Sequence, residues 1–181
     1  QQTPLCDPET GSYCSSDQTQ SGDVTGAVDL NVTVDQLEVT TYATGNLLTG
    51  GIEATSGALT SRQGRAGAAR ARTAVVLNGQ SDGVVGLTTE ARGNHLSAST
   101  DVATFALDAA QTATGEEVTA RTALSAPTGH MLGGGFAATT AVANGVALGG
   151  PSSSITGTVD QSAQTTVLAE TVADVQYIPA S

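Results

Sequence analysis

The sequence contains no lysine and no tryptophan, and aromatic residues make up only 3% of its 181 residues. Hydrophobic residues still account for 39%, so the apolar content consists mainly of alanine, valine and leucine. Small side chains cannot fill a wide gap between two layers at the packing density of a protein interior. The sequence therefore predicts one domain of ordinary size with a thin core.

Positive charge is also scarce, because six arginines stand against 17 acidic residues and the formal net charge is −11. Such a surface repels phosphates, so we expect no nucleic acid among the partners. No apolar run approaches the roughly 20 residues that a membrane-spanning helix needs. We therefore expect no transmembrane segment.

The two cysteines, Cys6 and Cys14, lie close together in the turn-rich stretch TPLCDPETGSYC. Their spacing allows a small disulfide loop, which is typical of an oxidising compartment, and two free thiols are the alternative. We expect residues 1–20 to form an N-terminal disulfide loop that acts as a cap or docking segment, and residues 21–181 to form a repetitive domain. The sequence thus predicts an exported protein that contacts hold outside the cell.

A repeat runs through the chain. The stretch TTYATGNLLTG, which begins at Thr40, has a counterpart 48 residues later in TTEARGNHLSA. The stretch ARTA occurs at Ala71 and again at Ala120, and a weaker copy of the first stretch, TTAVANGVALGG, begins at Thr139. Self-similarity at a period of 20–50 residues is typical of stacked architectures. Each repeat is therefore expected to add an equivalent unit to one stack.

The repeated segments alternate between apolar and polar residues with a period of two. AVDLNVTVDQLEV, from Ala27 to Val39, is one example, and this pattern predicts strands with one dry face. DVATFALDAAQTA has a helix-like pattern, but we interpret it as strand and turn. The sequence therefore predicts an all-β fold, a β-solenoid (β-helix) with repeats of about 48 residues and two coils per repeat. An antiparallel β-sandwich is the alternative.

A solenoid stacks equivalent residues of successive coils, and stacked asparagine amides can form a hydrogen-bonded ladder at a corner. The asparagines of such a corner ladder would be Asn46, Asn94 and Asn144. The neighbouring glycines would supply tight-turn positions, and they are Gly45, Gly93 and Gly145. Stacked coils also predict a stiff rod with open ends, and an open end could join a second chain by adding strands, which allows end-to-end self-association.

No pattern in the sequence indicates a catalytic or metal centre. His95 and His130 fall at different places in the repeat, and no HExxH, GxSxG or paired-cysteine zinc spacing occurs. Glu116 and Glu117 are adjacent, so on a strand they would point to opposite faces and be poorly placed for glycoside hydrolysis. We therefore expect no enzyme activity, no cofactor and no metal. A phage tail-fibre segment or a carbohydrate-active enzyme on a β-helix is the alternative.

Four of the six arginines lie in the stretch SRQGRAGAARAR. They could contact a polyanion or an acidic face of a partner through charge-assisted hydrogen bonds. They could instead balance neighbouring acids such as Glu90 and Glu116. The four residues are Arg62, Arg65, Arg70 and Arg72.

The threonine-, alanine- and glycine-rich repeats, the absence of lysine and the TTxATGN-type corners resemble the holdfast attachment protein D family of stalked alphaproteobacteria. The resemblance extends over most of the chain and rests on overall texture. It implies a secreted protein of the bacterial cell surface, associated with the outer membrane, that anchors an adhesive polysaccharide. The partners it implies are an outer-membrane pore-forming lipoprotein and an amyloid-like fibre subunit. It implies no residue-level binding site.

Overall fold

The computed structural model describes residues 5–7, 13–52, 56–100, 104–150 and 154–176, and these residues contain strands and no helix. The strands are β1 (Leu5–Asp7), β2 (Tyr13–Gln20), β3 (Val24–Val32), β4 (Leu37–Ile52), β5 (Ser56–Arg65), β6 (Ala69–Leu77), β7 (Gln80–Ser81), β8 (Val85–Thr100), β9 (Thr104–Ala113), β10 (Glu117–Met131), β11 (Gly135–Gly149), β12 (Ser154–Ala163) and β13 (Thr166–Gln176). The expectation of an all-β chain is therefore confirmed for the described residues.

The strands form three sheets, which we call A, B and C. Sheet A has the order β1-β2-β5-β9-β12, sheet B the order β13-β10-β6-β3 with β7 beside β10, and sheet C the order β11-β8-β4. The pairing is parallel throughout the described strands except between β1 and β2. The antiparallel sandwich is therefore wrong, and the parallel sheets are consistent with a β-solenoid.

The chain visits the three sheets in turn, and we call each circuit a winding. The first winding consists of β2, β3 and β4, the second of β5, β6 and β8, the third of β9, β10 and β11, and the fourth begins with β12 and β13. Residues that meet between neighbouring windings are 45 to 50 positions apart, as in Gln18 with Gln63 and Asn94 with Asn144. One repeat therefore forms one winding of three strands, and the prediction of two coils per repeat is wrong.

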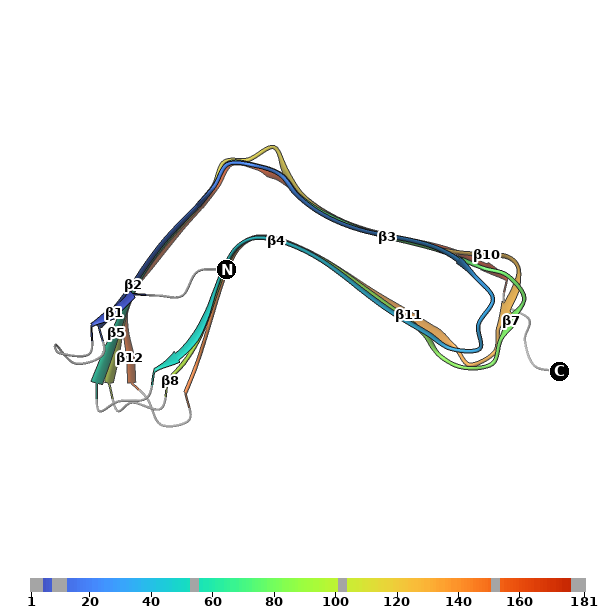
Figure 1. Ribbon diagram of the computed structural model, residues 1–181, viewed down its shortest axis with the longest axis horizontal. Coiled ribbons are helices and arrows are strands. Elements are labelled where there is room, and N and C mark those ends of the chain that lie inside the picture. Colours follow the sequence, from blue (N-terminus) through green and yellow to red (C-terminus); the bar gives the residue numbers. More distant parts are fainter. Residues whose placement is uncertain (1–4, 8–12, 53–55, 101–103, 151–153, 177–181) are drawn as a thin grey trace.

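The windings stack along the shortest axis of the molecule. Figure 1 looks down this axis, and the strands of each sheet overlie one another in that view. The cross-section is a long, bent band in which sheet C forms the inner side of the bend (Figure 1). Four strands about 4.8 Å apart span much less than one strand of 16 residues at about 3.3 Å per residue. The molecule is therefore flat, and the predicted rod is wrong.

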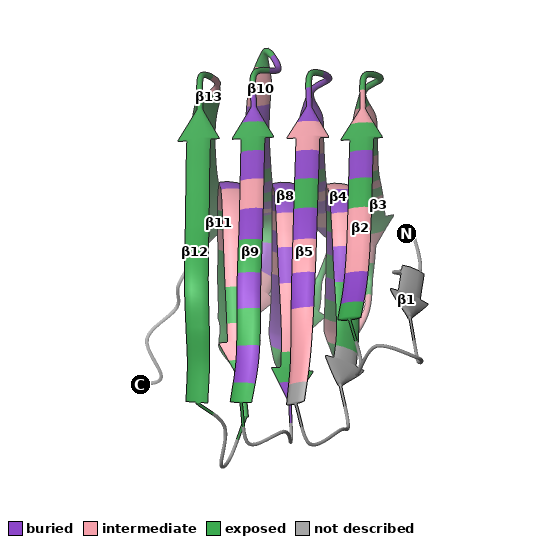
Figure 2. Ribbon diagram, turned by 90° about the vertical axis from the view of Figure 1, so that its left-hand side faces the viewer, coloured by how far each residue is buried: buried purple, intermediate pink, exposed green. Residues whose placement is uncertain are grey.

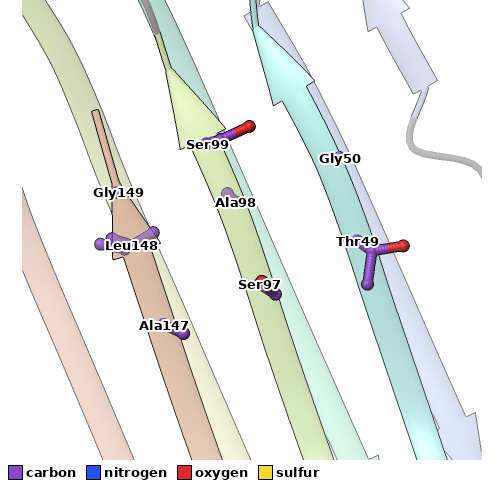
Figure 3. Close-up of a pocket in the computed structure, with 8 residues that line it drawn as sticks. All are labelled: Thr49, Gly50, Ser97, Ala98, Ser99, Ala147, Leu148 and Gly149. Carbon is purple, nitrogen blue, oxygen red and sulfur yellow. The ribbon is translucent and has the colours of Figure 1, made fainter. Parts of the chain in front are cut away.

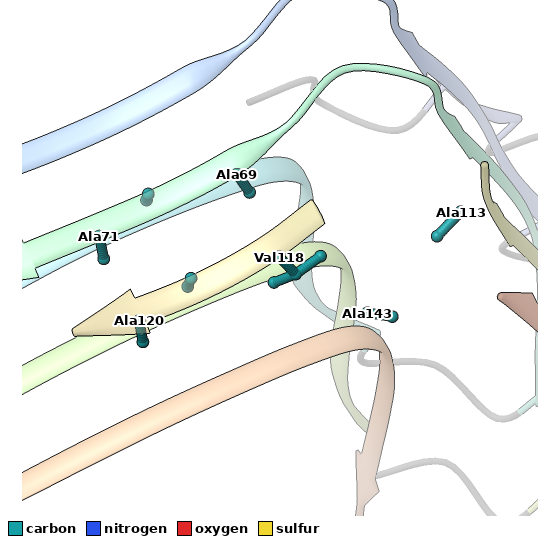
Figure 4. Packing of buried hydrophobic residues seen from close by; sticks show 8 residues of the cluster. Ala69, Ala71, Ala113, Val118, Ala120 and Ala143 are labelled. Atoms are coloured by element: carbon teal, nitrogen blue, oxygen red, sulfur yellow. The ribbon is translucent and has the colours of Figure 1, made fainter. Parts of the chain in front are cut away.

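The interior is as thin as the composition predicts. One of its three apolar clusters consists of seven alanines and Val118, contributed by all three sheets (Figure 4). Leucines and Phe105 fill a second cluster, and valines and leucines fill the third. Alanine allows two facing sheets to approach closely, so small residues at these positions set the distance between the layers.

The segment with the helix-like pattern is a strand, as we interpreted it. β9 has alternating burial from Thr104 to Ala113, and residues 101–103 of the same stretch lie outside the described residues. Across the part of the chain that the structure describes, no helix has the length and apolarity needed to cross a membrane.

Candidate functional site

Three asparagines of sheet C form a column through the interior. Asn46 donates from Nδ2 to Oδ1 of Asn94 at 2.9 Å, and Asn94 donates in the same way to Asn144 at 2.8 Å. The central member, Asn94, is 0% exposed. Each amide also donates to a backbone carbonyl of sheet A, and these carbonyls belong to Gly64, Thr112 and Ser162. The structure thus brings together the asparagines that the repeat places at corresponding positions.

A column of glutamines on sheet A faces the asparagines. Each glutamine Nε2 donates to Oε1 of the glutamine before it, at 2.8, 2.7 and 2.6 Å along the series Gln18, Gln63, Gln111 and Gln161. The first three also donate to the carbonyls of sheet C that directly follow the asparagines, which belong to Leu47, His95 and Gly145. Each column therefore binds the backbone of the opposite sheet and holds the two sheets in register.

A third column consists of threonine hydroxyls that alternate between sheets B and C. Neighbouring Oγ1 atoms lie 2.6 to 2.8 Å apart along the series Thr41, Thr73, Thr89, Thr122, Thr139 and Thr171. A hydroxyl can donate one hydrogen bond and accept others, so an unbroken series satisfies each member. The sequence reasoning missed both this column and the glutamine column. For the threonine column, the sequence signal was present in the repeated Thr-Thr pairs and in the threonine of ARTA.

One residue of each sheet C strand is skipped by the pairing. The skipped positions directly precede the asparagines and are Gly45, Gly93 and Ala143. Ala43 before the skip and Asn46 and Leu48 after it are all buried. Because side chains of a strand alternate between faces, a skip of one residue allows both halves of the strand to face the interior.

The glycines beside the asparagines do not form the tight turns that we predicted. The positive φ angles of glycines occur at Gly79, Gly134 and Gly157. At Gly93 an added Cβ would lie 2.4 Å from the carbonyl oxygen of Ala143, so glycine here permits close backbone approach. Gly145 is not the equivalent of Gly93, because it pairs with His95.

The arginines of residues 61–72 do not form one cluster. Arg65 points into the interior, is 2% exposed, and donates to the carbonyl oxygen of Glu117 at 2.6 Å. Burial lowers the pKa of its guanidinium, since desolvation disfavours the charged form. Arg62, in contrast, is exposed on sheet A.

Arg70 and Arg72 lie on the outer face of sheet B and form ion pairs within the chain. Arg70 contacts Glu117 and lies 2.8 Å from Asp23. The hydrogen bonds that Arg70 donates to these two carboxylates raise its pKa. Arg72 lies 2.7 Å from Asp29. These ion pairs favour the interpretation in which arginines balance neighbouring acids.

Of the two acids expected beside the arginines, one is in place and the other is not. Glu116 lies 3.5 Å from Arg70. Glu90 pairs instead with Arg92 on the outer face of sheet C. The expectation for Glu90 is therefore wrong, because β8 carries its own arginine two residues away on the same face.

The two histidines lie at different positions of the winding. In the strand register His95 is beside Leu47, and His130 is beside Gln80. Burial and the nearby Arg92 lower the pKa of His95. Among the described residues no group of three or more histidine, cysteine, aspartate or glutamate side chains is arranged to hold a metal ion.

A shallow depression of about 430 Å³ lies over the C-terminal parts of the sheet C strands (Figure 3). Its lining contains hydroxyl groups from β4 and β8, while β11 contributes only apolar residues and glycine. The lining residues are Thr49, Gly50, Ser97, Ala98, Ser99, Ala147, Leu148 and Gly149. None of these side chains is titratable near neutral pH. The depression can therefore offer hydrogen bonds to a polar ligand, and its described lining supplies no acid or base.

Near the N-terminus, β1 pairs with β2 so that Cys6 lies opposite Cys14 in the register. Cys14 is buried in an apolar cluster that extends from the first winding to the third and includes Leu59 and Phe105. Residues 1–4 and 8–12 of the expected N-terminal segment lie outside the described residues. The disulfide and the role of the segment as a cap or docking element stay predictions.

The three sheets and the three polar columns define a repetitive protein of parallel β-strands whose interior polar groups bind one another. The family model of holdfast attachment protein D matches residues 33–181, and the chain belongs to this family. The resemblance stated from the sequence is thereby confirmed, and the family implies a role in holdfast attachment at the bacterial cell surface. Comparisons with curated proteins and with solved structures found no match.

Proposed function

We propose that this protein is a non-enzymatic structural component of the bacterial cell surface that anchors an adhesive polysaccharide, the holdfast, to the outer membrane. The observation that carries the proposal is the family match over residues 33–181. The fold we propose is a β-solenoid with repeats of about 48 residues, built from the parallel sheets described above.

The interior supports a passive role. The asparagine, glutamine and threonine side chains of the interior form hydrogen bonds with one another and with the facing backbone. Such satisfied networks make a structure rigid and specific. A rigid stack suits a protein that has to transmit force between a polymer and the cell envelope.

The partners we propose are the polysaccharide, an outer-membrane pore-forming lipoprotein and an amyloid-like fibre subunit. The depression over the C-terminal parts of the sheet C strands supports the polysaccharide as a partner, because sugar hydroxyls exchange hydrogen bonds with serine and threonine. Contact with an acidic polymer through the arginines is best supported at Arg62, which is exposed, because Arg70 and Arg72 already hold carboxylates of the chain.

Deletion of the gene tests the anchoring role. Cells that lack the protein should still produce holdfast polysaccharide but release it into the medium under shear, and re-expression of the full chain should restore its retention. The measurement is lectin-stained polysaccharide on cells and in the medium. Full retention without the protein would overturn the proposal.

Incubation of the purified chain with acidic and neutral polysaccharides tests the non-enzymatic assignment. We expect no release of reducing ends or unsaturated sugars above a heat-denatured control. Turnover that increases with protein concentration would instead identify the chain as a carbohydrate-active enzyme.

A further inference from the structure

The strands of sheet C change the sheet that they face at the skipped residues. Before the skip, Thr41 accepts a hydrogen bond from Thr73 of sheet B, and after the skip, Asn46 donates to the carbonyl oxygen of Gly64 of sheet A. Figure 2 shows β4, β8 and β11 side by side behind sheet A. A bulge bends the strand that contains it, and sheet C forms the inner side of the molecular bend (Figure 1). The outer face of sheet C is therefore concave at the skip.

Outward side chains of β4 and β8 line this concave region, which we call the trough. Each of them is exposed or half-buried, and β8 lies between β4 and β11 in the sheet. The register places the chosen residues of the two strands next to one another across the skip. The residues that define the trough are Tyr42, Leu47 and Thr49 on β4 and Arg92, His95 and Ser97 on β8.

Arg92 fixes the orientation of His95 in the trough. Its Nη1 lies 2.7 Å from Nε2 of His95. A guanidinium can only donate, so Nε2 accepts and the proton of the neutral ring is on Nδ1. Nδ1 lies over Gly145 of β11, where an added Cβ would be 3.2 Å from it. Glycine thus keeps a side chain away from Nδ1, and the ring presents a directed N–H donor.

The trough is close to neutral within an acidic protein. Burial and the nearby Arg92 lower the pKa of His95, so its ring is uncharged at pH 7. Arg92 itself is paired with Glu90. The outer face of sheet A, in contrast, carries exposed acids such as Asp17 and Asp108. An uncharged ligand therefore meets no repulsion in the trough, whereas a polyanion would have to compete for an arginine that already holds a carboxylate.

The two sides of the trough offer the two kinds of contact that a sugar ring makes. On one side of the skip Tyr42 is 60% exposed, and its ring can stack on the apolar face of a sugar. On the other side Thr49 and Ser97 line the depression of about 430 Å³ and can exchange hydrogen bonds with sugar hydroxyls. A protein partner would instead need a desolvated apolar core. The trough therefore fits a sugar chain better than a protein.

We propose that the trough is the polysaccharide-binding site of this protein and that it takes uncharged sugar units, a site that rests on the anchoring function proposed above. Tyr42 stacks on the face of one unit, Nδ1 of His95 donates to a sugar oxygen, and the hydroxyls of Thr49 and Ser97 bind the chain where it crosses the depression. Arg92 is a positioning residue, because it acts through His95.

Two exposed tyrosines allow a matched test of the stacking contact. The probe is a set of holdfast polysaccharide fragments prepared by mild hydrolysis, and the dissociation constant is measured on the immobilised full chain. Tyr42→Ala should weaken binding at least about tenfold, and Tyr42→Phe, which keeps the ring, should stay within about twofold. Tyr13→Ala on sheet A removes a tyrosine that is 47% exposed and should leave the affinity unchanged.

Two exposed threonines allow the same test of the depression. Thr49→Glu places a carboxylate in its lining, and Thr112→Glu places one on the outer face of sheet A. Both side chains are exposed, so both variants should fold with nearly unchanged melting temperatures. The first should weaken binding of the fragments at least about tenfold, because a bound sugar would desolvate the carboxylate, and the second should have no effect.

The two histidines of the sequence report on the contact directly. In nuclear magnetic resonance spectra, the ring signals of His95 should shift when the fragments are added, and those of His130 should not. Arg92→Met should raise the pKa of His95 measured from the same signals, because the guanidinium lowers it. An unchanged pKa would show that Arg92 does not position the ring.

Equal affinities of the trough variants and their controls would overturn this site but leave the anchoring function standing, since the polysaccharide would then bind elsewhere on the chain. The absence of binding to the unsubstituted chain would instead count against the polysaccharide as a direct partner at all. A Tyr42→Ala variant that binds the fragments normally but is lost from the cell surface would show that the trough holds a protein, and the site would again be wrong.

Discussion

The third and fourth windings share the same backbone pairing but differ in how well their side chains are covered. Every residue of β12 pairs with a residue of β9. Phe105 on β9 is nevertheless 2% exposed, whereas Ile155 beside it on β12 is 38% exposed. Val118 on β10 is 0% exposed, and Val167 beside it is 46% exposed. Pairing along the stack therefore does not create the core, and the facing strand of sheet C does.

The first winding, at the N-terminal end of the stack, also shows that burial depends on a facing strand of sheet C. It has a neighbour on one side only, yet Ala43 and Leu48 are buried because β2, β3 and β4 together enclose an interior. A winding at an end of this stack can thus bury side chains when it contains a strand in each sheet. The contrast between enclosed and open windings can be tested with pairs of equivalent substitutions.

The largest difference is expected between Phe105→Ala and Ile155→Ala. Removal of the buried ring leaves a cavity and should lower the free energy of unfolding by about 3–5 kcal/mol. Removal of the exposed isoleucine should cost less than about 1 kcal/mol, because solvent already contacts it. Urea denaturation followed by circular dichroism measures both values. Similar losses for the two variants would mean that the fourth winding is enclosed in solution.

The asparagine column offers a second pair of equivalent substitutions. Asn94→Ala removes an amide that donates to Thr112 and Asn144 and accepts from Asn46, so several buried groups lose their partners. We expect a loss of about 2–4 kcal/mol, against about 1 kcal/mol for Asn144→Ala at the open end. Urea denaturation measures both losses, and equal losses would contradict the contrast between the buried centre of the column and its exposed end.

A smaller difference is expected in the threonine column. Thr89→Val breaks the hydroxyl series at a fully buried position between Thr73 and Thr122, and should cost about 1–2 kcal/mol. Thr171→Val removes the last member, which is exposed to water, and should cost less than about 0.5 kcal/mol. The melting temperatures of the two variants rank the effects, and the reverse order would show that the column does not stabilise the interior.

The smallest effect concerns an ionic contact between the first two windings. Asp23 accepts a hydrogen bond from the backbone of Ala68 and one from Arg70, and these lower its pKa below the ordinary value of 3.8. A carboxylate with a lowered pKa stabilises the folded state above the unfolded pKa, and this contribution is lost as the pH falls through the folded pKa.

The variant Asp23→Asn tests this contribution, with Asp160→Asn on β12 as the control for the loss of one charge. Asp23→Asn should melt below the unsubstituted protein at pH 7, and the gap should close as the pH falls below 3.8. A gap that persists at pH 2 would assign the effect to the geometry of the turn.

The period of the repeat and the alternation of apolar residues were sufficient to predict stacked strands and to place Asn46 above Asn94. They did not reveal the number of strands in a winding, because a period of 48 residues accommodates three long strands or more short ones equally well. The flat shape follows from strand length, which alternation does not define. The skip at Gly93 hid the continuity of β8, since a change of phase within a strand resembles a turn.

The arginine stretch, residues 61–72, shows a different limit of prediction from the sequence. Arg65 ends β5 and faces inward, whereas Arg70 lies on β6 and faces outward. The chain turns between them, and the side on which each arginine emerges depends on the phase with which the strands resume. Residue type alone favoured a surface position for both, so the buried Arg65 could not be predicted from composition.

The polar columns also make the length of this protein adjustable. Each winding presents to the next winding the same amides and hydroxyls that the previous winding presents to it. An additional winding could therefore be inserted without loss of these hydrogen bonds. Val118 pairs with Ala69, so tandem duplication of residues 69–117 would insert one complete circuit without altering either terminus. A lineage could thereby thicken the protein by about 4.8 Å at a time while keeping the same first and last windings.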